Sequence, residues 1–259
     1  QQRGQVHGAG CVFGTLGIMS TIATQLNAVL HRIEAASQAA GRQPHSVALL
    51  AVSKTFGPEA VREAYAAGQR AFGENYIQEA VDKMAALPDL PIQWHCIGPI
   101  QSNKTKLVAE HFDWVHSVDR LKIAQRLSEQ RPAHMPPLQV CLQVNVDGGA
   151  NKSGVAPSEA LALAQAVAGL PRLQLRGLMA IPEPAPDFEA AKALFMRCSG
   201  LFEQLKAQGL ALDTLSMGMT ADLEPAIHAG STMVRVGTAI FGGRPAKPSP
   251  QDEGSQPSA

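Results

Sequence analysis

The sequence predicts an α/β fold, a (β/α)₈ TIM barrel preceded by one extra helix. Short apolar runs alternate with helical patterns from residue 46 onward, and such alternation implies a parallel sheet. There are eight of these runs, which is the number that closes a barrel. An open doubly wound sheet is the competing architecture. It is disfavoured because no GxGxxG motif follows the first run.

The extra helix is expected over residues 20–41, where apolar positions recur with the helical period. Ser20 or Thr21 is suited to capping its start, and Gly41 is suited to ending it. The strands of the barrel are predicted at the eight apolar runs, which are 46–53, 70–73, 92–97, 113–118, 138–146, 175–181, 212–217 and 232–237. Helices are predicted between them, near 58–67, 75–86, 103–111, 119–130, 157–168, 187–208 and 221–229.

Proline and glycine support these boundaries. Pro58 and Pro157 stand where a first helical turn is predicted, a position that tolerates proline. Gly68, Gly169 and Gly209 stand where helices are predicted to end.

In this fold the active face is formed by the C-terminal ends of the strands. Polar residues and glycines gather at these ends. The polar residues and glycines are Lys54, Glu74, Asn75, His95, Gly98, Asn145, Ser216, Gly218, Arg235, Gly237 and Thr238, while Met179 and Pro182 close the sixth strand. We therefore expect a functional site on this face.

Composition excludes several classes of function. The formal net charge is zero and no basic cluster stands out, so a nucleic-acid footprint is unsupported. No apolar stretch reaches the length of a membrane span, and no secretory signal is visible. The cysteines have no pair spacing and read as isolated thiols in a reducing compartment, so we expect a cytoplasmic protein. No set of His, Cys, Asp and Glu has metal-ligand spacing.

The two ends of the sequence differ from its middle. Residues 1–18 are Gly-rich without a clear period, and we expect them to be disordered or extraneous, with Met19 as a natural start. Residues 19–244 are expected to form one barrel domain. Residues 245–259 form a Pro/Ser-rich tail, which we expect to be disordered because it buries too little apolar area to offset the entropy of ordering.

Lys54 ends the first apolar run, "LLAVSKTF" at 49–56. Burial disfavours the charged form of a lysine, and a free amine can attack a carbonyl group to form a Schiff base. The alternative is a lysine with a packed stem and a solvated head. Two further loops favour the chemical interpretation. "LSMGMTADLE" (215–224) and "STMVRVGTAIFGG" (231–243) follow strands seven and eight, where this fold commonly binds phosphate.

Seven segments together resemble one known family. They are "AVSKTF", "FGENYIQE", "WHCIGPIQSNK", "NKSG", "GLMAIP", "LSMGMTADLEPAI" and "VRVGTAIFGGR". In this order they closely resemble the pyridoxal 5′-phosphate homeostasis protein family, from about Ile22 to Arg244. Departures are mild: Thr220 stands where many relatives have serine, and Cys96 replaces a bulkier residue.

The resemblance implies a barrel like the N-terminal domain of alanine racemase, with pyridoxal 5′-phosphate (PLP) held as a Schiff base on Lys54. It implies that Arg235 faces the pyridine nitrogen and that Asn75 lies beside the ring. It implies that Ser216, Gly237 and Thr238 hold the phosphate. The function implied is a non-catalytic PLP carrier that serves vitamin B6 homeostasis, is monomeric and supplies PLP-dependent apoenzymes.

Two enzymatic alternatives stay open. A single-domain amino-acid racemase needs a second acid or base opposite Lys54, for which Tyr76 and His95 are candidates, while Tyr65 and His116 are interpreted as structural. A Schiff-base aldolase without cofactor would leave Arg235 unexplained.

Other polar residues have competing interpretations. Lys152 lies in "NKSG" and is a candidate second amine or a solvated loop residue. Lys104 and Lys106 are interpreted as surface charges. Glu74 is expected to orient Lys54 or a water, or to favour the start of a helix through the macrodipole.

Overall fold

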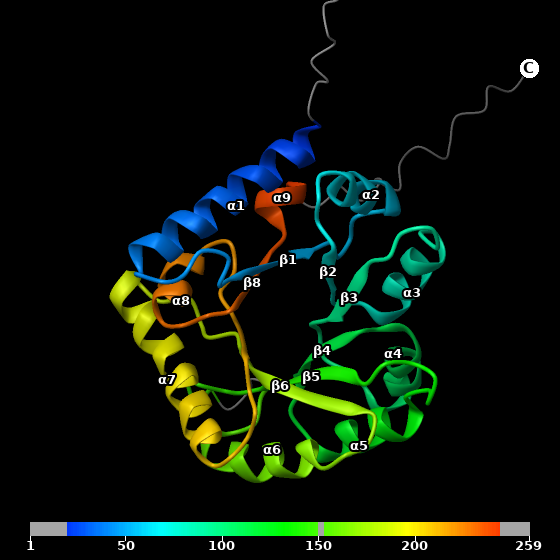
Figure 1. Ribbon diagram of the computed structural model, residues 1–259, viewed down its shortest axis with the longest axis vertical. Helices are drawn as coiled ribbons and strands as arrows, with labels where there is room; N and C mark the ends of the chain where they lie inside the picture. The colour runs from blue at the N-terminus through cyan, green and yellow to red at the C-terminus, as the bar shows by residue number, and fades with distance from the viewer. Residues whose placement is uncertain (1–19, 150–152, 244–259) are drawn as a thin grey trace, which may run out of the picture.

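The strands close into a parallel barrel in the computed structural model, which describes residues 20–149 and 153–243 (Figure 1). Within these ranges each strand pairs with its neighbour in chain order, and β1 pairs with β8 to close the barrel. The strands are β1 (Ala48–Val52), β2 (Ala71–Glu74), β3 (Gln93–Cys96), β4 (Trp114–Val118), β5 (Leu138–Gln143), β6 (Leu173–Ala180), β7 (Thr214–Met217) and β8 (Met233–Val236). The predicted (β/α)₈ barrel with an extra N-terminal helix is confirmed.

Helices surround the barrel and match the predicted order (Figure 1). They are α1 (Thr21–Ala39), α2 (Pro58–Ala66), α3 (Ile77–Ala85), α4 (Thr105–His111), α5 (Leu121–Gln130), α6 (Ala160–Ala168), α7 (Phe188–Ala207), α8 (Leu223–His228) and α9 (Thr238–Phe241). Short 3₁₀ turns, η1 (Ser102–Lys104) and η2 (Pro157–Glu159), precede α4 and α6. The predicted boundaries differ from the observed ones by a few residues, mainly because strand pairing ends before the apolar runs do.

Local sequence signals account for several helix ends. The Ser20 hydroxyl accepts a hydrogen bond from the Ala23 N–H at 3.1 Å and so caps α1. Pro58 occupies the first turn of α2, where a missing N–H costs nothing. Gly68 and Gly209 follow helices with φ of 110° and 93°, which glycine adopts without strain.

The extra helix α1 covers the seam of the barrel. In Figure 1 it lies beside α8 and α9, next to β1 and β8, the two strands whose pairing closes the barrel. Arg32 of α1 donates to the Glu224 carboxylate and, at 2.6 Å, to the backbone carbonyl of Thr220. Arg42 donates to the Ile227 carbonyl at 3.1 Å. Helix α1 thereby fixes the segment that follows β7.

The apolar core has an outer and an inner part. Residues on the outward side of the strands, such as Leu49 and Phe72, pack against the helices. Inside the barrel, Leu50 and Val52 contact Ile97 and Met233, and a separate group is formed by Trp114, Cys141 and Met179. Because successive strand residues point to opposite sides, this division identifies the residues of each strand that face the barrel interior.

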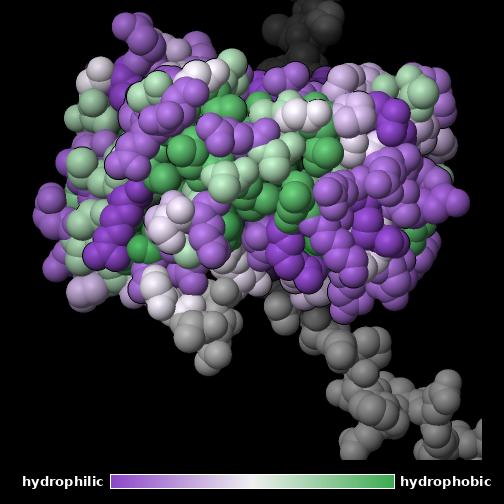
Figure 2. All heavy atoms as spheres, turned by 90° about the horizontal axis from the view of Figure 1, so that it is seen from below, coloured by the Kyte–Doolittle hydropathy of each residue, from purple (hydrophilic) through white to green (hydrophobic). Residues whose placement is uncertain are grey.

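Seen from the side that carries α6, apolar side chains gather across the middle of the surface and hydrophilic ones flank them (Figure 2). Leu161 and Leu163 of α6 are half-buried. Across the described ranges, no helix is both long enough and apolar enough to cross a membrane. The expectations for residues 1–18 and 245–259, and for Lys152, lie outside the described residues.

Candidate functional site

Four neighbouring strand ends bring the predicted site residues together. The barrel places β7, β8, β1 and β2 side by side. Val52 is paired with Gly73, and Ala51 with Val236. The residues just beyond these pairs are Lys54 after β1, Asn75 after β2, and Gly237 and Thr238 after β8. These four residues therefore lie on one continuous part of the C-terminal face.

Lys54 is half-buried, as a packed stem with its head at the barrel mouth would be, rather than fully buried. It continues the alternation of Leu50 and Val52, whose side chains face the barrel interior. Its side chain makes no hydrogen bond or ion pair with any residue that the structure describes. The amine is thus available at the mouth of the barrel.

The residues on both sides of Lys54 are held by α3. The Lys83 ammonium donates to the Ser53 carbonyl at 2.8 Å, and the Glu79 carboxylate accepts from the Thr55 N–H at 2.7 Å. Thr55 has a φ of 68°, a left-handed conformation that is uncommon outside glycine. Phe56 then stacks on Phe241 of α9, with ring centroids 5.3 Å apart. These contacts fix the turn that carries Lys54.

Glu74 has a role that the sequence interpretation missed. It is fully buried on the outer side of the barrel, where it accepts from Lys83 Nζ at 2.6 Å and from the Ser53 hydroxyl at 2.8 Å. Burial raises its pKa, and the charge of Lys83 and hydrogen bonds from Lys83 and Ser53 oppose this. Glu74 therefore neither contacts Lys54 nor acts at a helix start. The spacing of Glu79 and Lys83, four residues apart on α3, was the available signal.

Asn75 offers an acceptor that the protein leaves unused. Its Oδ1 atom is buried and has no hydrogen-bond partner in the part of the chain that the structure describes, although buried polar atoms are normally paired. A side chain at Gly98 would collide with the backbone of Asn75, because a Cβ atom there would lie 2.5 Å from the Asn75 carbonyl oxygen. Gly98 thus lets β3 approach Asn75 closely. An unpaired acceptor at this position suits a ligand that donates.

Arg235 is buried inside the barrel with neutral partners. It donates from Nη1 to the Ser216 hydroxyl at 2.8 Å and from Nη2 to the Ala180 carbonyl at 3.2 Å. Burial lowers its pKa to about 10, and the charge of Asp222 opposes this. At this pKa the guanidinium remains charged at neutral pH.

Ser216 lies inside the barrel beside Arg235. It is fully buried, and its hydroxyl contacts both Arg235 and Nδ1 of His116, the latter at 2.8 Å. His116 in turn contacts His95, with 2.8 Å between Nε2 and Nδ1. Both histidines are fully buried inside the barrel, so His95 does not reach the active face.

Burial keeps both histidines neutral. It lowers the pKa of His95 to about 3, and it lowers the pKa of His116 well below its usual range, helped by the neighbouring His95 and Arg235. Sequence reasoning interpreted His116 as structural and missed its link to Ser216. Strand alternation was the available signal, since His95 pairs with Trp114 and His116 lies two positions further along β4.

The end of β8 presents free backbone donors. Gly237 and Thr238 begin α9, and their N–H groups have no backbone partner in the described part of the chain. A Cβ atom at Gly237 would lie 3.1 Å from the Val52 carbonyl oxygen, so glycine lets β8 approach β1. The Thr238 side chain is exposed. The Gly218 carbonyl accepts from the Arg235 N–H at 2.9 Å, which joins the two predicted loops.

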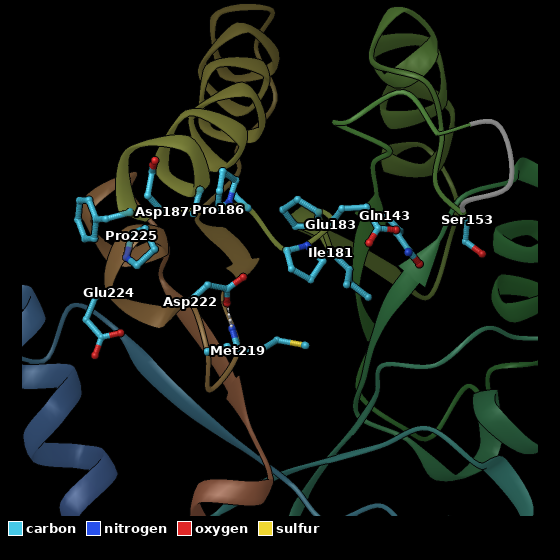
Figure 3. Close-up of a pocket in the computed structure, with 16 residues that line it drawn as sticks. Gln143, Ser153, Ile181, Glu183, Pro186, Asp187, Met219, Asp222, Glu224 and Pro225 are labelled. Carbon is cyan, nitrogen blue, oxygen red and sulfur yellow. Dashed lines mark hydrogen bonds between the residues drawn. The ribbon is translucent and has the colours of Figure 1, made fainter.

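A cavity of about 930 Å³ opens beside this constellation, at the ends of β5, β6 and β7 (Figure 3). Ile181 and the segment 182–188 form one wall, and Met219 and Asp222 form another. Asp222 accepts from the Met219 N–H at 2.7 Å. Exposed Ile181, Phe188 and Met219 give the cavity an apolar character. Lys54 and Asn75 do not line it.

The remaining candidates are placed as follows. Tyr65 packs against the core, and Arg70 lies 3.8 Å from its ring centroid, as a structural role requires. Tyr76 precedes α3 and is 49% exposed, so it neither packs nor caps through its side chain. Both Lys104 and Lys106 were interpreted as surface charges. Lys106 is exposed, as expected, whereas Lys104 is half-buried. No group of three or more metal-binding side chains occurs among residues 20–149 and 153–243.

Comparison with known proteins gives a consistent result. The family model "Alanine racemase, N-terminal domain" matches residues 24–245. The pyridoxal phosphate homeostasis protein of Pseudomonas aeruginosa is 65% identical over 226 residues, which cover 87% of this chain and 97% of that protein. The protein of the same name from Vibrio cholerae is 56% identical over 230 residues, covering 87% of this chain and 98% of its own.

A solved structure shows the same architecture. PipY of Synechococcus elongatus, determined with PLP bound, has a TM-score of 0.76 and 40% sequence identity; the match covers 85% of this chain and 100% of PipY. The barrel, the order of its site segments and these matches agree. The chain belongs to the pyridoxal phosphate homeostasis protein family, which is built on the barrel of the alanine racemase N-terminal domain.

Proposed function

We propose that this protein binds PLP as a Schiff base on Lys54 and serves PLP homeostasis as a carrier. The observation that carries the proposal is the Lys54 amine, which has no partner among the described residues and lies beside Asn75 and Gly237 on one face of the barrel. The membership of the chain in the family supports it, as does PipY, a relative whose structure was solved with PLP bound.

The residues present fit this cofactor. Asn75 Oδ1 is a buried acceptor without a partner among residues 20–149 and 153–243. Within the same ranges the N–H groups of Gly237 and Thr238 are unpaired, and Thr238 adds an exposed hydroxyl, as a phosphate group requires. Arg235 brings a positive charge that is hydrogen-bonded only to neutral oxygens in the described part of the chain. We assign Arg235 to the pyridine nitrogen.

Each residue has a distinct task in this proposal. The Lys54 amine attacks the PLP aldehyde, a C=N bond forms, and the aldehyde oxygen leaves as water with the two N–H hydrogens. Gly237 and Thr238 bind the phosphate through N–H and hydroxyl donors. Ser216 was also predicted to bind phosphate, but its hydroxyl already contacts Arg235 and His116. We propose that Ser216 acts through Arg235.

Arg235 also bears on whether the protein turns over substrate. PLP is a strong electron sink when its ring nitrogen is protonated, usually beside a carboxylate. A guanidinium only donates and disfavours that protonated form. The geometry therefore supports holding the cofactor rather than broad carbanion chemistry. PLP is released when an acceptor amine, including one in a PLP-dependent apoenzyme, replaces Lys54 in the imine. We also propose that the protein acts as a monomer.

A racemase is the second candidate, because Arg235 also permits simple proton abstraction. It needs an acid or base opposite Lys54. Tyr76 is the candidate that the geometry leaves, since it is exposed beside Asn75, whereas His95 is buried inside the barrel. A racemase assay on the wild-type protein and on Tyr76→Phe tests it. Racemisation that is lost in Tyr76→Phe would favour the enzyme.

The first experiment is a visible absorbance spectrum of the purified protein, followed by borohydride reduction and peptide mass mapping. We expect a yellow protein with the pyridoxyl mass on the peptide that contains Lys54. Lys54→Ala should lose the imine absorbance and keep some non-covalent binding. A wild-type protein that takes up no added PLP would refute the proposal, and equal affinities of wild type and Lys54→Ala would refute the covalent role.

A further inference from the structure

A chain of hydrogen-bonded side chains crosses the inside of the barrel. It begins at Gln93, which is exposed at the N-terminal end of β3, and passes through His95, His116 and Ser216 to Arg235. Each of the four contacts is 2.8 Å long. The interior of such a barrel is ordinarily packed with branched apolar side chains, so a hydrogen-bonded chain of this length needs an explanation.

The Gln93 end of this chain sets the direction of the hydrogen bonds. Gln93 presents its carbonyl oxygen, so His95 donates to it from Nε2 and, being neutral, accepts at Nδ1. His116 therefore donates from Nε2 to His95 and accepts at Nδ1 from the Ser216 hydroxyl. Arg235 can only donate, and it donates to Ser216. Both imidazoles thus carry their proton on Nε2.

This direction matters because Arg235 is a buried cation. Within the described ranges no carboxylate lies at ion-pair distance from its guanidinium, and Asp222 acts only at longer range. A buried charge without compensation is costly. In this chain the O–H of Ser216 and the Nε2–H groups of His116 and His95 point away from Arg235. The negative ends of the three side-chain dipoles therefore point toward it. Aligned hydrogen bonds polarise one another and strengthen this effect.

We propose that His116 and His95 are positioning residues for Arg235. Through Ser216 they hold the guanidinium in place, and they stabilise its charge in the way that a carboxylate would. Unlike a carboxylate, they do not neutralise it, so the positive charge stays available to the ligand. The inference rests on the proposed function, in which Arg235 faces the ring of PLP.

The first test needs no cofactor. Long-range ¹⁵N–¹H NMR spectra of the PLP-free protein report which ring nitrogen of each histidine carries the proton. We expect both His95 and His116 to be neutral and protonated on Nε2 at pH 7. A proton on Nδ1 of His116, or a doubly protonated ring at either position, would overturn the proposal, whatever the outcome for PLP binding.

The second test measures PLP binding by calorimetry and visible absorbance in three variants. His116→Phe removes both ring nitrogens at similar volume. His116→Asn keeps an acceptor near Ser216. His31→Gln, on the exposed face of α1, is the control. We expect His116→Phe to weaken binding about tenfold or more, because a hydrogen-bond chain to a charged group is lost. We also expect its absorbance maximum to shift, as altered contact with the ring would require.

The variants separate the two proposals. His116→Asn should recover part of the affinity, and His31→Gln should match the wild type. A folded His116→Phe protein with wild-type affinity and an unshifted spectrum would overturn the positioning role. A wild-type protein without PLP binding would instead refute the proposed function. If His116→Phe fails to fold, the NMR measurement on the unmodified protein decides.

Discussion

The ammonium group of Lys83 lies 2.8 Å from the backbone carbonyl oxygen of Ser53, the residue immediately before Lys54. The same ammonium contacts Glu74 at 2.6 Å. A buried ion pair on the outer side of the barrel therefore holds the strand end that carries Lys54. Lys83 has a structural role, and it binds the carbonyl of the residue next to the lysine that we propose to hold PLP.

Replacing Lys83 by methionine should destabilise the protein by about 3–5 kcal/mol, because it leaves the Glu74 carboxylate buried without its partner. Equilibrium unfolding in urea measures this change. The double variant Glu74→Gln with Lys83→Met removes both charges and should regain much of the stability. Lys106→Met, whose side chain is 73% exposed, is the matched control. Equal stabilities of the Lys83 and Lys106 variants would contradict the role given to the buried pair.

The buried histidines should make stability depend on pH. Burial lowers the pKa of His95 to about 3 and that of His116 in the same direction, whereas an unfolded histidine titrates near 6.5. Below about pH 6.5 the unfolded chain binds protons that the native state does not. The free energy of unfolding should therefore decrease as the pH is lowered below about 6.5, until His95 itself titrates near pH 3.

For each histidine the slope approaches about 1.4 kcal/mol per pH unit. Urea unfolding at pH 7 and pH 5.5 measures it. A double variant, His95→Asn with His116→Asn, should have a smaller slope, and His31→Gln should keep the wild-type slope. A double variant with an unchanged slope would show that other groups cause the pH dependence.

Gly218 should tolerate no side chain. Its φ is 98°, and a Cβ atom would lie 2.6 Å from the Cβ atom of Ala226. Gly218→Ala should therefore lower the free energy of unfolding by about 1–3 kcal/mol. Gly200→Ala is the control, since Gly200 lies within α7 with no atom near its virtual Cβ, and it should stabilise by about 0.5–1 kcal/mol. Thermal or urea unfolding of both variants should show opposite signs.

The phosphate site can be tested with two ligands. Thr238→Val removes the exposed hydroxyl at the start of α9 and keeps the shape of the side chain. It should weaken PLP binding about tenfold, as expected for one hydrogen bond to a charged group, and leave binding of pyridoxal, which lacks the phosphate, unchanged. Calorimetry with both ligands measures this. Thr24→Val, at an exposed position of α1, should leave the affinities for both ligands unchanged. An equal loss of affinity for PLP and pyridoxal in Thr238→Val would argue against a phosphate contact.

Sequence alone predicted the parts of the structure that depend on local rules. Ser20 caps α1 and Pro58 begins α2, because both preferences act within one helical turn. Strand alternation and the barrel rule also predicted that Lys54 follows β1, at the C-terminal end of the strand, where the structure has it. Contacts between distant residues were beyond such rules. Ser216 and His116 are 100 residues apart, and only the closed barrel brings them together.

The extra helix α1 has a consequence for folding during synthesis. Arg32 reaches its partner Glu224 across 192 residues, and β1 finds β8 only after nearly the whole barrel has been made. Such distant pairings must overcome the entropy of closing a long loop, and they form slowly. Helix α1 leaves the ribosome before every strand of the barrel, and it is therefore among the last elements to find its place. Until then its apolar face, including Leu26 and Ile33, has to stay free of wrong partners.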